Sequence, residues 1–191
     1  MIFNDDEVNL PEKLLQALTT DQLVVFVGAG VSARAYPEQA VGTYYPNFRE
    51  LAHEVATRLG RPITADEQRS LEAGFIDRVL GEWDYQKGDV RRHAADILQE
   101  NENGQRLDLH RAILRLFAGH LTPRIITTNF DRLLIRARGA EGLATDTRWE
   151  ISLAPALPPI RRLSGISFLH GSVDEPLDMV LTEGYWTSLY G

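Results

Sequence analysis

Three short apolar runs along the chain predict the strands of a parallel sheet. Residues 23–27 (LVVFV), 124–127 (RIIT) and 166–171 (ISFLHG) are rich in β-branched or aromatic residues and lead into glycine or polar residues. Such runs are typical of strands buried on both faces of the sheet in an α/β protein. A fourth run, residues 178–182 (DMVLT), predicts a further short strand.

Segments with helical periodicity fill most of the chain between these runs. In each of them apolar residues recur at a spacing of three or four positions, which is typical of a helix with one buried face. Pro11 lies in the first turn of the first helix, and Gly60 and Pro62 stop the second. The predicted helices cover residues 10–18, 47–59, about 65–80, about 90–99, 107–117 and 132–138.

Nearly a hundred residues separate the first two predicted strands. A plain strand–helix–strand unit needs only about 30 residues. We therefore expect one α/β domain over residues 1–191, with a Rossmann-like parallel sheet and a helical subdomain inserted at about residues 47–120. Because few strands are predicted for a doubly wound sheet, we also expect this domain to be incomplete at its C-terminus.

Composition and charge restrict the classes of function. The chain has 191 residues, of which 43% are hydrophobic and 25% charged, as in an ordinary globular domain. A formal net charge of −7 argues against direct binding of nucleic acid, whose phosphates it repels. The absence of cysteine excludes disulfides, a cysteine nucleophile and a cysteine-type zinc site. With no signal peptide and no apolar run long enough to cross a membrane, we expect a cytoplasmic chain.

A glycine-rich segment follows the first predicted strand. Residues 28–33 (GAGVSA) form a G-x-G-x-x-A pattern, in which Gly28 permits a tight turn and Gly30 lets the backbone approach a pyrophosphate. Ala33 is small enough for a following helix to pack closely on the strand, and the start of that helix would attract phosphate. The pattern favours a dinucleotide ligand, although a turn without a ligand can have the same sequence.

Two common classes of nucleotide-binding protein are disfavoured. Glu50 has about the spacing of the acidic residue that binds the ribose in ordinary Rossmann dehydrogenases, but it lies within a predicted helix. The Gly-Lys-Ser/Thr part of a Walker A loop is absent after Gly28.

Polar residues also follow the second and third predicted strands. Thr128, Asn129 and Asp131 follow the second strand, and His170 and Gly171 end the third. Ligands of open α/β sheets bind at the carboxyl ends of the strands, and the near-neutral pKa of histidine suits a general base. Thr128 or Asn129 could instead cap a helix, and the His-Gly pair could be a plain turn. The occurrence of polar groups at three strand ends favours a shared site.

The segments GAGVS, TTNFD and LHG, in this order, resemble the three signature blocks of the sirtuin fold, including the prokaryotic sirtuin-like NAD hydrolases of anti-phage defence. The resemblance runs from about residue 23 to residue 190. Residues 46–49 (PNFR) are similar to the sirtuin PDFR block, with Asn47 in place of aspartate, and VLTEGYW is similar to the defence branch. The resemblance implies a hydrolase that converts NAD to nicotinamide and ADP-ribose, as the effector domain of a defence system.

The resemblance also implies a role for individual residues. Asn129 is expected to position the ribose or the attacking water, Asp131 to contact the nicotinamide carboxamide, and His170 to act as general base. The residues expected to bind NAD are Gly28, Ala29, Gly30, Ser32, Phe48, Arg49, Thr128 and Gly171.

Departures from the sirtuin pattern bear on the type of reaction. Sirtuin deacylases carry a four-cysteine zinc module, which this chain cannot build, and their stretch between the residues matching Asn129 and His170 is shorter. Hydrolysis of NAD without zinc is therefore favoured over a second possibility, NAD-dependent protein deacylation. A third possibility is a non-catalytic module that senses NAD or ADP-ribose.

The sequence also leads to expectations about partners and metal ligands. We expect NAD as the small-molecule partner, a homo-oligomer, further domains or a separate sensor protein, and no membrane contact. No metal site is predicted, because the other histidines lack ligand spacing and are interpreted as surface or packing residues. They are His53, His93, His110 and His120.

Overall fold

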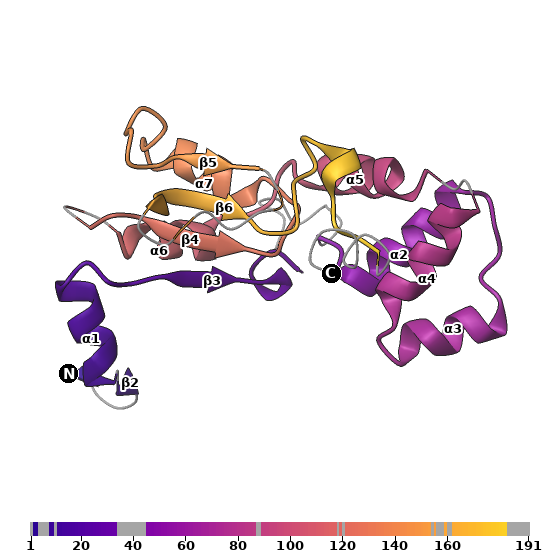
Figure 1. The fold of residues 1–191 in the computed structure, drawn as a ribbon, viewed down its shortest axis with the longest axis horizontal. Helices are drawn as coiled ribbons and strands as arrows, with labels where there is room; N and C mark the ends of the chain where they lie inside the picture. The colour runs from indigo at the N-terminus through magenta and orange to yellow at the C-terminus, as the bar shows by residue number, and fades with distance from the viewer. Residues whose placement is uncertain are drawn as a thin grey trace.

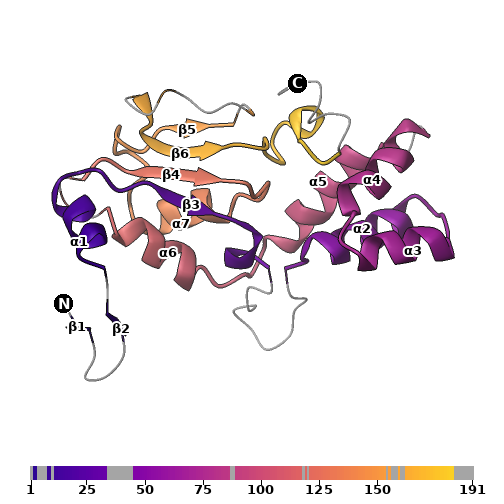
Figure 2. The same ribbon diagram turned by 60° about the horizontal axis from the view of Figure 1, so that its bottom comes forward.

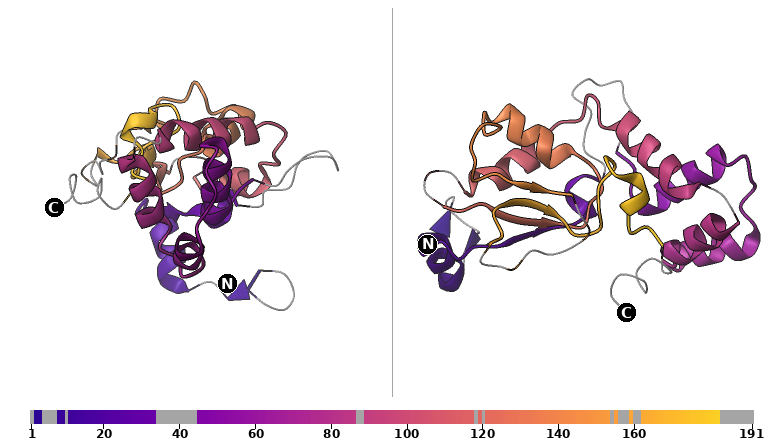
Figure 3. Two further views of the ribbon diagram at one scale, coloured as in Figure 1. Left: turned by 90° about the vertical axis from the view of Figure 1, so that its right-hand side faces the viewer. Right: turned by 45° about the horizontal axis from the view of Figure 1, so that its top comes forward.

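The computed structural model has an α/β fold with a Rossmann-like parallel sheet at one end and a cluster of helices at the other (Figure 1). The right view of Figure 3 shows the two parts side by side along the long axis of the molecule. The structure describes residues 2–3, 8–9, 11–33, 45–86, 89–117, 119, 121–153, 155, 159 and 162–182. Within these residues, no helix is both long and apolar enough to cross a membrane.

The sheet has four parallel strands in the order β3-β4-β6-β5. Three of them were predicted from the apolar runs, and the strands themselves are confirmed as β3 (Val25–Val27), β4 (Arg124–Thr127) and β6 (Gly165–Phe168). Burial on both faces is wrong for β3, because it lies at the edge of the sheet and its Phe26 is 68% exposed. The edge strand β5 (Ile151–Ser152) was not predicted, because two residues are too few to show a period. The same holds for the N-terminal antiparallel pair, in which β1 (Ile2–Phe3) lies beside β2 (Val8–Asn9).

The register of the sheet brings three strand ends together. Val27 is paired with Thr127, and Thr127 with Phe168. The next residues continue these ladders, since Thr128 N–H donates to the Val27 carbonyl at 3.0 Å and Leu169 N–H to the Thr127 carbonyl at 2.8 Å. The segments that follow β3, β4 and β6 therefore leave the sheet side by side at one edge.

The strand predicted over residues 178–182 is wrong. A short 3₁₀ helix, η3 (Pro176–Asp178), precedes an irregular stretch here. Met179 and Leu181 are buried in the helical cluster, so their apolar character reflects packing against helices. A short apolar run cannot distinguish these two forms of burial.

Seven α-helices occur in the described part of the chain, and all six predicted helical segments contain at least one. The segment predicted over about 65–80 holds two helices, because Gly74 adopts a φ of +91° and ends the first. The helices are α1 (Glu12–Thr19), α2 (Phe48–Arg58), α3 (Ala65–Glu72), α4 (Ile76–Tyr85), α5 (Val90–Asn101), α6 (Asp108–Arg115) and α7 (Leu133–Ala140).

Two hydrophobic cores divide the helices between them. Helices α2 to α5 share one core, to which Leu51, Leu80 and Ile97 contribute. Helices α6 and α7 lie against one face of the sheet in the second core (Figure 2), where Leu114 of α6 packs with β-strand side chains. The helical subdomain predicted at about residues 47–120 therefore differs from the structure at its end, since α6 belongs to the sheet.

The start of α2 is fixed by a reciprocal capping box. The side chain of Asn47 accepts hydrogen bonds from the backbone N–H groups of Arg49 and Glu50, both at 3.0 Å. In return, the Glu50 carboxylate accepts from the Asn47 N–H at 2.8 Å. Glu50 thus lies in a helix, as predicted. The cap also fixes the segment just before α2, and this segment faces the ends of the strands.

Candidate functional site

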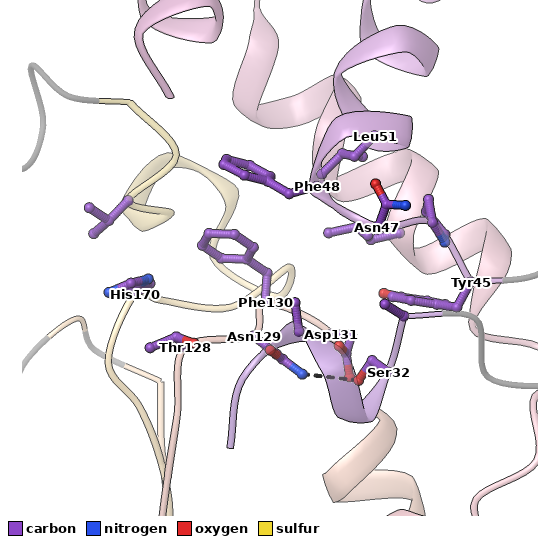
Figure 4. Close-up of a pocket in the computed structure, with 15 residues that line it drawn as sticks. Ser32, Tyr45, Asn47, Phe48, Leu51, Thr128, Asn129, Phe130, Asp131 and His170 are labelled. Carbon is purple, nitrogen blue, oxygen red and sulfur yellow. Dashed lines mark hydrogen bonds between the residues drawn. The ribbon is translucent and has the colours of Figure 1, made fainter. Parts of the chain in front are cut away.

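A cavity of about 260 Å³ lies where the carboxyl ends of the strands face the helical cluster (Figure 4). Its walls come from the loop after β3, the segment after β4, His170 after β6, and helices α2 and α5. The lining residues are Ala29, Ser32, Ala33, Tyr45, Pro46, Asn47, Phe48, Leu51, Leu98, Thr128, Asn129, Phe130, Asp131, His170 and Val180.

The glycine-rich loop forms one rim of this cavity. One turn of 3₁₀ helix, η1 (Ala29–Val31), follows Gly28. The helix that the motif suggested after it would extend into residues 34–44, which lie outside the described part. The backbone from Gly28 to Gly30 is exposed, and no atom lies within 4 Å of the position that a Cβ at Gly30 would occupy. The loop is therefore accessible to a ligand.

Ser32 is the centre of a buried polar network. The side-chain amide of Asn129 donates to Ser32 Oγ at 3.0 Å, and His110 Nε2 lies 3.2 Å from the same oxygen. Ser32 also hydrogen bonds to the Asp131 carboxylate. A hydroxyl can donate once and accept twice, so Ser32 has the capacity for all three contacts.

His110 belongs to the network around Ser32, although its spacing predicted only a surface or packing residue. It is buried on α6, and this burial lowers its pKa to about 4, which keeps the ring neutral at neutral pH. Its helical spacing to Leu114 and Phe117, both buried, was the available signal for an inward-facing ring. Contact with Ser32 across 78 positions of sequence could not be predicted from that spacing.

Asp131 combines a structural contact with a place in the cavity wall. Its carboxylate accepts a hydrogen bond from Leu133 N–H at 3.0 Å, at the start of α7, so Asp131 satisfies a helix-end donor. That role had been considered for Thr128 or Asn129. Burial raises the pKa of Asp131 to about 6, against the opposing effect of hydrogen bonds from Ser32 and Leu133. The group is still mainly ionised at pH 7.

Two buried polar atoms on the cavity have no hydrogen-bond partner among the described residues. They are Asn129 Oδ1 and the hydroxyl of Tyr45, on side chains that are 7% and 2% exposed. A buried polar atom without a partner costs about 1–3 kcal/mol. Figure 4 shows both side chains at the cavity, which marks it as a place for a polar ligand. Tyr45 was not among the predicted site residues.

His170 lies on the opposite side of the cavity from Tyr45 (Figure 4). It is half-buried, and burial lowers the pKa of its ring, so the neutral form predominates at neutral pH. The Phe130 ring lies beside it, with the ring centres 6.3 Å apart. A neutral imidazole next to a cavity can accept a proton.

The structure places the predicted site residues in two groups. Asn129, Asp131 and His170 line the cavity together, as do four of the residues predicted to bind NAD: Ala29, Ser32, Phe48 and Thr128. The other four, Gly28, Gly30, Arg49 and Gly171, do not line it.

Arg49 and Gly171 have visible structural contacts. The Arg49 guanidinium donates to the Glu72 carbonyl at the end of α3, at 3.3 Å. Gly171 has a φ of +81°, and a Cβ there would lie 2.7 Å from the Asp178 carbonyl oxygen, so this turn requires glycine. Most of the VLTEGYW segment, with Trp186, lies outside the described residues, and so does His120.

Comparison with known proteins gives a relative but no function. The chain is similar to "Uncharacterized protein y4cA" of Sinorhizobium fredii (strain NBRC 101917 / NGR234), with 33% identity over 187 residues. The match covers 94% of this chain and 15% of the other protein, so the chain spans a small part of the relative's length. No family model matches the chain.

Proposed function

We propose that this chain is a sirtuin-like domain that binds NAD and hydrolyses the nicotinamide–ribose bond. The observation that carries the proposal is the convergence of three polar segments, from the ends of β3, β4 and β6, on one cavity. Their sequences and their order resemble the sirtuin blocks, which supports NAD as the ligand. The same resemblance supports a role as the effector domain of a prokaryotic anti-phage defence system.

The size of the cavity suggests how NAD would lie. Ligand pockets usually measure about 300–1,000 Å³, so a cavity of about 260 Å³ suits one half of the dinucleotide. In our proposal the nicotinamide and its ribose enter the cavity. The pyrophosphate then lies over the exposed backbone from Gly28 to Gly30.

The proposed reaction needs a positioned water more than a strong nucleophile. Nicotinamide leaves as a neutral molecule, taking the electron pair of the bond between its ring nitrogen and C1′ of the ribose. The oxygen of a water molecule forms the new bond to C1′. His170, neutral at neutral pH, accepts the proton that this water loses and passes it to solvent.

Asn129 and Asp131 orient the reacting groups in this proposal. The contact with Ser32 holds the amide nitrogen of Asn129, which leaves Oδ1 to accept a hydrogen bond from a ribose hydroxyl or from the water. The ionised Asp131 accepts from the amide N–H of nicotinamide. Hydrogen bonds from the protein to both the ribose and the nicotinamide would fix the orientation of the scissile bond in the cavity.

Incubation of the full-length protein with NAD, followed by chromatography, tests the proposal. We expect free nicotinamide and ADP-ribose in equal amounts. His170→Ala should lower turnover by about 10²- to 10⁴-fold while NAD still binds, the usual effect of removing a positioned acid or base. Asn129→Ala should abolish turnover with only about 1 kcal/mol of lost stability.

Control variants and the products formed distinguish the proposed function from its two alternatives. His93→Ala and Asn103→Ala alter a histidine and an asparagine outside the cavity and should keep the wild-type rate. A product in which an acyl group has moved from an acylated peptide to ADP-ribose would indicate a deacylase. Tight NAD binding with no product would indicate a sensing module. A normal rate in folded His170→Ala would remove the proposed base.

A further inference from the structure

Among the described residues, Tyr45 is the buried polar side chain of the cavity that neither the sequence motifs nor the proposed reaction uses. Its ring is 2% exposed and packs in the core of the helical cluster, just before the capping box of α2. Its hydroxyl points into the cavity (Figure 4) and has no hydrogen-bond partner among the described residues. A phenylalanine would fill the same core space without this unsatisfied polar atom, so packing alone does not explain the hydroxyl.

The surroundings of the hydroxyl define what it can bind. The Asp131 carboxylate and Glu102 act electrostatically on Tyr45, and with burial, the larger effect, they raise the pKa of the phenol above its ordinary value. The hydroxyl therefore stays protonated and is available as a donor. Asp131 is an acceptor on the same side of the cavity, yet it does not pair with Tyr45. A ligand group between the two must offer an acceptor to Tyr45 and a donor to Asp131.

We propose that Tyr45 is a specificity residue that donates a hydrogen bond to the carbonyl oxygen of a primary carboxamide on the leaving base, while Asp131 accepts from the amide nitrogen of the same group. This inference rests on the proposed function and extends it to a residue outside the three sequence blocks. A primary carboxamide supplies one acceptor and two donors on adjacent atoms. A carboxylate in this place would put its charge against Asp131, and an unsubstituted ring would leave both side chains unpaired.

Tyr45→Phe separates this role from a purely structural one, because it removes one oxygen atom and keeps the buried ring. The substrates to compare are NAD and the dinucleotide whose base is unsubstituted pyridine. For NAD, we expect kcat/KM to fall by about threefold to tenfold, the effect of losing one neutral hydrogen bond. For the pyridine dinucleotide, kcat/KM should not change. Tyr85→Phe, at a tyrosine that is 92% exposed, is the matched control.

Two further measurements show whether the variant is intact. The affinity for ADP-ribose, which lacks the nicotinamide base, should be the same in wild type and Tyr45→Phe. The thermal midpoint of ligand-free Tyr45→Phe should equal or exceed that of the wild type, because the hydroxyl has no partner there. A lower midpoint together with equal losses on both dinucleotides would make Tyr45 a structural residue and overturn the inference.

Failure of the inference and failure of the proposed function give different results. If the wild type hydrolyses NAD and Tyr45→Phe leaves the ratio of kcat/KM between the two dinucleotides unchanged, only the role of Tyr45 is overturned. If the wild type binds NAD without hydrolysing it, the hydrolase proposal fails and affinities replace kcat/KM in the same comparison. If the wild type binds neither NAD nor ADP-ribose, both proposals are overturned.

Discussion

His110 and Asp131 contact the same serine, and burial shifts their pKa values in opposite directions. The pKa of His110 falls from 6.5 to about 4, so the unfolded chain binds more protons between these values. Its contribution to stability is present above pH 6.5 and is lost as the pH falls towards 4. The pKa of Asp131 rises from 3.8 to about 6, so its contribution is present below pH 3.8 and is lost as the pH rises through 6.

These opposite contributions predict a pH-dependent difference between the wild type and His110→Gln. Glutamine does not titrate, so subtracting the unfolding free energy of the variant isolates the histidine, while Asp131 and His170 cancel. We expect the wild type to lose about 3 kcal/mol relative to His110→Gln between pH 6.5 and pH 4. Urea unfolding at a series of pH values measures this difference, and a constant difference would contradict the buried, neutral His110.

At the residue scale, the sequence identified those site residues that directly follow a strand. Asn129, Asp131 and His170 were predicted because a polar residue after an apolar run is visible locally. His110 and Tyr45 were missed for a physical reason. Tyr45 lines the cavity from the start of α2, and His110 contacts Ser32 from α6. Both are distant in sequence from the strand ends, and only packing sets these contacts.

At the element scale, Gly165 decides whether β6 can begin beside β5. It has a φ of +86°, and a Cβ at this position would overlap the backbone of Glu150, the residue just before β5. The Gly165 N–H donates to the Pro123 carbonyl at 2.7 Å, and the next N–H, of Ile166, to the Glu150 carbonyl at 2.8 Å. The backbones approach too closely here for any side chain.

Gly165→Ala should therefore destabilise the protein by about 3 kcal/mol or more, through overlap and a left-handed backbone. Gly139→Ala is the matched control, because this glycine lies in α7 with nothing within 4 Å of an added Cβ. The control should gain about 0.5 kcal/mol from helix propensity. Thermal or urea unfolding of both variants compares them, and equal stabilities would show that the strand start tolerates a side chain.

Other elements show how far periodicity alone determines structure. It predicted β3, β4 and β6 and a helix in each of the six helical segments, because each of these runs or spacings extends over several apolar residues. It joined α3 and α4, since apolar spacing continues across Gly74 while the backbone there turns. It wrongly predicted a strand at residues 178–182, since burial against helices and burial in a sheet select the same residue types.

At the scale of the whole molecule, Glu102 connects the helical cluster to the sheet. It follows α5 and is 1% exposed, and its carboxylate accepts from the backbone N–H of Arg132 at 2.7 Å and from its guanidinium at 2.9 Å. Arg132 also contacts Asp174, which follows β6. This group thus fixes the residue next to Asp131 relative to the helices that close the cavity.

Glu102→Gln should lower the free energy of unfolding by about 2 kcal/mol. This is less than the 3–5 kcal/mol lost on breaking a fully buried pair, because the Arg132 side chain is 36% exposed. The pKa of Asp131 should also fall, since the Glu102 charge raises it. Glu175→Gln, at an exposed glutamate, is the control. Urea unfolding and a titration of Asp131 by NMR measure the two effects, and equal stability of both variants would contradict this role for Glu102.

The sequence by itself determined the α/β class, the three core strands and the polar segments at their ends, because these depend on residues close together along the chain. Only the tertiary structure decided that α6 joins the sheet, that Ser32 links Asn129 to His110, and that Tyr45 faces the same cavity. The physical reason is that hydrophobic burial fixes which face of an element turns inward, but not which distant element it meets. Those pairings follow from sheet register and from the packing of whole helices.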